Sequence, residues 1–151
     1  MAVPSILKDN LSIPVIGSPL FIISNPDLVI AQCKAGVIGS FPALNARPEP
    51  VLEEWLDRIT SELKDHDKNN PDNKAAPFAV NLIVHRSNDV VEGELELCVR
   101  HQAPIVITSL GAVSELVDRV HAYGGLVFHD VINLRHAGKA IDAGVDGLIA
   151  V

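Results

Sequence analysis

The chain has 151 residues, about the size of one average domain and too few for two large ones. Hydrophobic residues make up 48% of it and charged residues 21%, so it can bury a core and is not intrinsically disordered. The net charge is −7 and the basic residues are scattered, whereas nucleic acids and anionic membranes require clustered cations. We therefore expect a single domain over residues 1–151, with no nucleic-acid partner and no membrane partner.

Cysteine usage and the N-terminal segment indicate the compartment. Cys33 and Cys98 are too few for a disulfide scaffold, and neither lies in a C-x-x-C pair or a cluster with metal-ligand spacing. Segment 2–10 has no basic region followed by an apolar run, and no apolar stretch approaches the ~20 residues of a bilayer-spanning helix. We predict a soluble, cytoplasmic protein without a metal site.

Short apolar, β-branched runs alternate with helical patterns, and a glycine often ends the predicted helix just before the next run. The expected strands are segments 14–16, 37–39, 78–84, 105–108, 126–128 and 147–151. The expected helices are the segment between the Asn25 cap and the Gly36 stop, 49–64, 88–101, 112–122 and 133–143. The polar, proline-interrupted segment 65–74 is expected to be a surface loop.

The spacing of these elements predicts the fold class. The runs that start near Ile105, Leu126 and Gly147 are each 21 residues apart, close to one compact βα unit. Repeated βα units with buried strands imply a parallel sheet with right-handed crossovers, either doubly wound or a barrel. Because a (β/α)8 barrel needs ~250 residues and eight strands, we interpret this α/β chain as the first six strands of a TIM-type barrel, truncated before strands seven and eight.

Candidate binding residues lie where strands end, since ligands bind there in parallel α/β folds. Gly17, Ser18, Pro19 and Leu20 follow the first predicted strand. They form either a plain turn or a place where Gly17 lets the backbone and Ser18 approach a planar ligand.

Asn81 is a carboxamide inside an otherwise apolar predicted strand. An unsatisfied buried amide costs about 1–3 kcal/mol, so this side chain must find hydrogen-bond partners. Either the neighbouring backbone satisfies it within the core, or it binds a polar ligand over the strand ends. We favour the ligand.

The remaining polar residues at strand ends give no assigned catalytic group. His129 stands beside Asp130, which suggests an oriented acid–base pair, but neighbours on an extended chain point to opposite faces. A loop histidine next to a capping aspartate is an equally good interpretation, and His85 is a further candidate without a role. Thr108 and Ser109 are interpreted as turn formers, and His66, His101, His121 and His136 as solvated.

Taken in order, several segments resemble the nitronate monooxygenase family, also called the 2-nitropropane dioxygenase family. The resembling segments are 14–20 (PVIGSPL), 35–41 (AGVIGSF), 80–82 (VNL), 122–125 (AYGG) and 143–151 (AGVDGLIAV). Members are FMN-dependent TIM barrels that oxidise alkyl nitronates with dioxygen, and a sister group reduces enoyl thioesters using FMN and a nicotinamide. The resemblance implies FMN as cofactor, a nitronate and dioxygen as reactants, and a flavin ring that lies along Gly17, Ser18, Pro19 and Leu20 and is hydrogen-bonded by Asn81.

The family pattern also places essential parts beyond Val151. In the family, a glycine-rich segment with the proposed catalytic histidine follows the sixth strand, and loops after strands seven and eight hold the FMN phosphate. The resemblance therefore implies no catalytic base on this chain, and we expect the 151-residue chain alone to be inactive. The alternatives are an FMN-dependent enoyl thioester reductase and a non-catalytic flavin-binding remnant. The physiological substrate and a homo-oligomeric state are left open.

Overall fold

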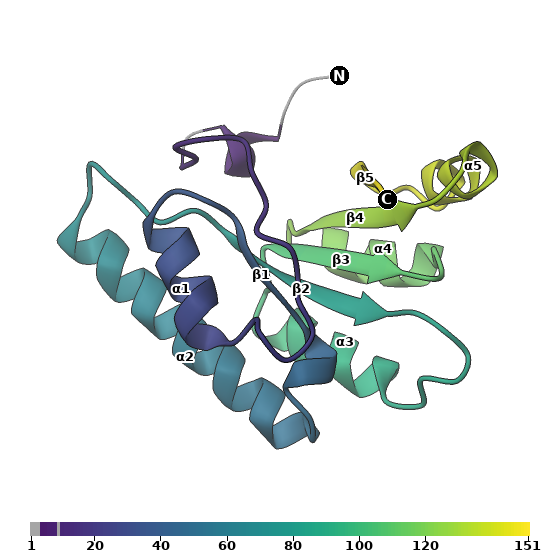
Figure 1. Ribbon diagram of the computed structural model, residues 1–151, viewed down its shortest axis with the longest axis horizontal. Coiled ribbons are helices and arrows are strands. Elements are labelled where there is room, and N and C mark those ends of the chain that lie inside the picture. Colours follow the sequence, from purple (N-terminus) through teal and green to yellow (C-terminus); the bar gives the residue numbers. More distant parts are fainter. Residues whose placement is uncertain (1–3, 9) are drawn as a thin grey trace. The chain divides into compact units, whose positions relative to one another are not determined.

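The computed structural model describes residues 4–8 and 10–151 of the chain (Figure 1). Residues 1–3 and 9, part of the N-terminal segment expected to lack a targeting signal, lie outside the described residues. Two compact units make up the chain, Met1–Ala79 and Val80–Val151. The described residues form five strands, which follow one another in the sheet in chain order.

The first unit is mainly helical. The unit contains the short 3-10 helices η1 (Ser5–Leu7) and η2 (Ala43–Asn45), strand β1 (Gly39–Pro42), and helices α1 (Pro26–Lys34) and α2 (Glu49–Asn69). Helix α1 begins where the sequence predicts, because the Asn25 side chain accepts a hydrogen bond from the Leu28 amide at 3.0 Å. Helix α2 buries one face formed by Leu52, Leu56, Ile59 and Leu63.

Two predictions for the first unit are wrong in part. Helix α2 continues to Asn69, five residues into the expected loop 65–74, because no residue before Pro71 interrupts the helix. The expected strand 14–16 is reduced to a single parallel bridge between Ile16 and Ile38. Pro14 has no amide to donate and the turn residues Gly17 and Pro19 follow at once, so the described residues form five strands instead of six.

The second unit is a regular series of alternating strands and helices. Strand β2 (Phe78–Ile83) begins two residues before this unit and continues into it. It is followed by α3 (Val91–Arg100), β3 (Ile105–Ser109), α4 (Ser114–His121), β4 (Leu126–Val131), α5 (Leu134–Asp142) and β5 (Gly147–Ala150). Strands β3, β4 and β5 pair in parallel. All of β3 is buried, as expected for a parallel strand covered on both faces. The predicted parallel α/β fold is confirmed.

The register of these strands decides which side chains meet. Strand β3 pairs with β4 so that Ile105 lies opposite Leu126 and Thr108 opposite His129. This offset equals the 21-residue spacing seen in the sequence, whereas β5 is shifted and pairs Gly147 with Phe128. A Cβ atom at residue 147 would lie 2.9 Å from the Phe128 ring, so glycine is needed there.

Helix α4 and helix α5 pack against β4, and α3 contacts α4. Among the described residues, none of the helices combines the length and the apolar character needed to cross a membrane.

Candidate functional site

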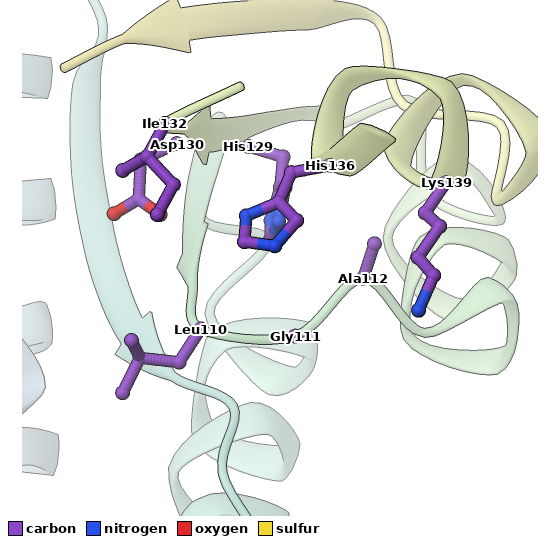
Figure 2. A pocket seen from close by; sticks show the side chains of 8 residues that line it. All are labelled: Leu110, Gly111, Ala112, His129, Asp130, Ile132, His136 and Lys139. Atoms are coloured by element: carbon purple, nitrogen blue, oxygen red, sulfur yellow. The ribbon is translucent and has the colours of Figure 1, made fainter. Parts of the chain in front are cut away.

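A pocket of about 310 Å³ opens beside the carboxyl ends of β3 and β4 and the beginning of α5 (Figure 2). Its lining residues all follow a strand, end a strand or lie on α5: Leu110, Gly111, Ala112, His129, Asp130, Ile132, His136 and Lys139. Because ligands of parallel α/β folds bind at the carboxyl ends of the strands, this pocket is the candidate site of the second unit.

His129 is the buried polar residue of this pocket. Its side chain is only 5% exposed, and its Nδ1 atom lies 2.7 Å from the Oγ1 atom of Thr108, its register partner on β3. Burial is the largest effect on the pKa of His129 and lowers it; the Asp130 charge and a hydrogen bond with the Thr108 backbone raise it by less, and His136 has the smallest effect, which lowers it. The ring is therefore held in one orientation, with its neutral form favoured and its Nε2 atom without a hydrogen bond in the described part of the chain.

Asp130 does not orient the imidazole as the acid–base interpretation of the sequence required. Within the described residues, its carboxylate makes no hydrogen bond to His129, although its charge raises the pKa of that histidine. Figure 2 shows the Asp130 carboxylate turned away from the imidazole rings of His129 and His136. The group that positions His129 is the hydroxyl of Thr108, a residue that the sequence presented only as a turn former.

Asn81 of β2 lies near the carboxyl end of β3. Its Nδ2 atom donates to the Ile107 carbonyl at 3.1 Å and to the Ser109 hydroxyl at 2.8 Å. The Ile107 carbonyl can only accept, so the amide nitrogen must face it and the Oδ1 atom points elsewhere. Across the described residues, Oδ1 accepts no hydrogen bond, so the backbone alone does not satisfy this carboxamide. Its role toward a ligand stays a prediction.

Gly17, Ser18, Pro19 and Leu20 belong to the first unit, and most of their polar backbone is already engaged. The amide of Gly17 donates to the Ile38 carbonyl at 2.7 Å, and its carbonyl accepts from the Ser40 hydroxyl. The amide of Leu20 donates to the Ser24 hydroxyl at 2.9 Å. Of these amides only that of Ser18 is free of hydrogen bonds to described residues, as is the Ser18 hydroxyl.

Gly17 lies against the end of the Gln32 side chain of α1. A Cβ atom there would lie 2.5 Å from Nε2 of Gln32, far closer than real contacts allow. These are the end atoms of a flexible side chain, so a larger residue at position 17 would require only that the Gln32 side chain move.

Two other histidines near strand ends, His85 and His136, are both exposed, and only His136 lines the pocket. His85 is exposed, and its Nδ1 atom pairs with the Ser87 hydroxyl at 2.7 Å in a surface loop outside the pocket. His136 is solvent-exposed as expected, yet it lines the pocket together with Lys139. The sequence contained one indication of this arrangement. His136 and Lys139 are three residues apart on a helix that begins directly after a strand end, and this spacing places both side chains on one face of the helix.

The chain is a parallel α/β protein whose candidate site lies at the ends of the strands. Solved structures of other proteins have a similar fold. No protein-family model matches the chain, and no curated protein matches it. A nitroalkane oxidase from Streptomyces ansochromogenes is similar in structure, with a TM-score of 0.80, 19% identity, and coverage of 97% of this chain and 48% of that one.

Two further solved structures show the same architecture. FabK from Thermotoga maritima superposes with a TM-score of 0.77 at 19% identity, covering 96% of this chain and 42% of that chain. A structure described as native KDPGal gives a TM-score of 0.60 at 16% identity, covering 93% and 60%. The chain thus spans less than half the length of the first two proteins, and its fold matches part of a TIM-type barrel.

Proposed function

We propose that this chain is the flavin-ring-binding part of an FMN-dependent oxidoreductase of the nitronate monooxygenase type, which oxidises alkyl nitronates with dioxygen. The observation that carries the proposal is the unused Oδ1 atom of Asn81, whose amide nitrogen is held by Ile107 and Ser109. The structural likeness to a protein named nitroalkane oxidase supports the same direction.

The residues present fit an isoalloxazine ring. One edge of that ring alternates carbonyl acceptors with an N–H donor, so the fixed Oδ1 atom of Asn81 can accept from the donor. Within the first unit, the amide and hydroxyl of Ser18 have no hydrogen bond to described residues and Leu20 is 45% exposed. The contact of Gly17, Ser18, Pro19 and Leu20 with a flavin ring is kept as a separate proposal that rests on the resemblance. When bound, FMN would supply a two-electron acceptor that dioxygen regenerates.

The chain's own contribution is to bind and orient. Asn81 would fix the ring edge, and the neutral imidazole of His129 would keep a free Nε2 atom at the adjoining pocket. No residue is assigned as the catalytic base. We therefore expect the 151-residue chain to bind FMN weakly and to show no turnover.

The test is an FMN titration of the chain with and without Asn81→Ala, using Asn69→Ala on the exposed end of α2 as the matched control. Weaker FMN binding in the Asn81 variant alone supports the proposal. Equal binding in all three proteins would contradict it.

A second candidate function is an FMN-dependent enoyl thioester reductase, favoured by the likeness to FabK at a TM-score of 0.77. The two functions differ in the substrate that should reach the bound flavin. Propane-2-nitronate should perturb the flavin absorption spectrum of the loaded chain if the first proposal is right, and a crotonyl thioester if the second is. A flavin-binding remnant would respond to neither.

A further inference from the structure

The carboxamide of Asn81 has used its hydrogen-bond donors and kept its acceptor. Its Nδ2 atom carries two hydrogens, and these bond the Ile107 carbonyl at 3.1 Å and the Ser109 hydroxyl at 2.8 Å. Asn81 is only 6% exposed. Its Oδ1 atom accepts no hydrogen bond from the described residues, yet it is not one of the buried polar atoms that lack a partner there, so it is open to solvent. A ligand can therefore reach this acceptor.

Ser109, the last residue of β3, places a hydrogen-bond donor beside that acceptor. A hydroxyl has one hydrogen to donate and two lone pairs that accept. The Asn81 nitrogen occupies one lone pair, and within the described part of the chain the hydroxyl hydrogen has no acceptor. Because the hydroxyl accepts from an amide, it is polarised and becomes a better donor. Ser109 is 9% exposed and its carbonyl accepts from the Val84 amide at 2.9 Å, so its position is fixed.

An acceptor next to a donor selects a particular chemistry. A carboxylate only accepts hydrogen bonds, so one of its oxygens would face the Oδ1 atom of Asn81 as a second acceptor. An open-chain trans amide directs its N–H and its C=O to opposite sides and meets only one of the two groups. A cyclic imide holds an N–H and a neighbouring C=O on the same edge of a ring. It can donate to Asn81 and accept from Ser109 at once.

We propose that Ser109 is a second ring-binding residue. In this arrangement Oδ1 of Asn81 accepts from the N–H of a cyclic imide, and the Ser109 hydroxyl donates to the neighbouring ring carbonyl. The inference rests on the proposed function, because the isoalloxazine ring ends in such an imide, with a carbonyl on each side of the N–H. The Ile107 carbonyl keeps the Asn81 carboxamide from turning over, since a turned carboxamide would set two acceptors against each other. All three residues lie in the second unit.

Methylation of the ring nitrogen tests the acceptor. Lumiflavin carries the imide N–H, and 3-methyllumiflavin carries a methyl group in its place. The chain should bind 3-methyllumiflavin about fivefold more weakly than lumiflavin, through loss of one hydrogen bond, and Asn81→Ala should abolish this difference. Equal binding of the two flavins to the unaltered chain would overturn the inference. Absence of lumiflavin binding would overturn the proposed function as well.

The carbonyl stretch of bound lumiflavin tests the donor. In Ser109→Ala a ring carbonyl loses a hydrogen bond, so isotope-edited infrared spectroscopy should show its band at higher wavenumber. The matched control is Ser61→Ala on the exposed surface of α2, where the hydroxyl bonds the Arg58 carbonyl and the band should not move. Circular dichroism verifies the fold of both variants. An unmoved band in Ser109→Ala with lumiflavin still bound would overturn the inference and leave the proposed function standing.

Discussion

The Oγ1 atom of Thr108 lies 2.7 Å from the Nδ1 atom of His129, and the two residues are register partners on β3 and β4. Both side chains are buried, so little water competes for this contact. The same hydroxyl lies 3.3 Å from the Phe128 carbonyl, which gives Thr108 a second partner on β4. The pair therefore fixes the imidazole by strand pairing, with its other nitrogen left for the pocket.

Replacing Thr108 by valine should destabilise the protein by about 1–3 kcal/mol, because the shape is kept while Nδ1 of His129 loses its buried partner. Urea unfolding measures the effect. The matched control is Thr60→Val on α2, where the hydroxyl is buried without a hydrogen-bond partner and its removal should cost nothing. Equal losses in the two variants would contradict the importance of the Thr108–His129 contact.

Stability should fall as the pH is lowered below the ordinary pKa of histidine. Burial lowers the pKa of His129 in the folded protein from its usual 6.5. Between the two values the unfolded chain binds more protons, so the stabilising contribution is complete above pH 6.5 and is lost as the pH falls through the folded pKa. Melting temperatures across this range should show a smaller slope in His129→Gln, and an unchanged slope in His85→Gln, whose site is exposed. The same slope in both variants would exclude His129 as its source.

Asn81→Ala should weaken FMN binding by about 1 kcal/mol, roughly fivefold in Kd, through loss of one hydrogen bond. Ser109→Ala should weaken it less, since Ile107 still holds the Asn81 amide. Fluorescence quenching of FMN measures both. An effect of Ser109→Ala larger than that of Asn81→Ala would argue against the assigned contact.

The chain should self-associate at high concentration. Among the described residues, β5 has a strand partner on one side only, and Leu134 and Val151 are 91% and 76% exposed. An apolar strand with a free edge pairs readily with another chain. Light scattering after size-exclusion chromatography should detect oligomers, and Leu148→Lys on β5 should reduce them. A monodisperse monomer would contradict this expectation.

The sequence predicted the second unit better than the first, for physical reasons. In the second unit, apolar runs, helix patterns and glycine stops all indicate the same elements, and the 21-residue spacing even matches the β3–β4 register. In the first unit, the run at 14–16 is apolar but flanked by prolines and glycine, so it has too few backbone groups to pair. Local polarity likewise suggested a loop where α2 continues.

The candidate site was only partly visible in the sequence. Asn81 was visible because a carboxamide contrasts with its apolar strand, and its contacts agree with an unsatisfied acceptor. The contact of Thr108 with His129 depends on strand register, and the place of His136 and Lys139 depends on how α5 follows β4. Neither follows from composition or from the residues next in sequence.

The most direct measurement is a parallel titration of the chain with FMN and with lumiflavin, which keeps the ring and lacks the phosphate, followed by the visible absorption of the flavin. If the chain binds the ring through Asn81, both flavins should bind saturably with similar affinity, and Asn81→Ala should weaken both about fivefold. Absence of saturable lumiflavin binding, or binding of both flavins that Asn81→Ala leaves unchanged, would contradict the account.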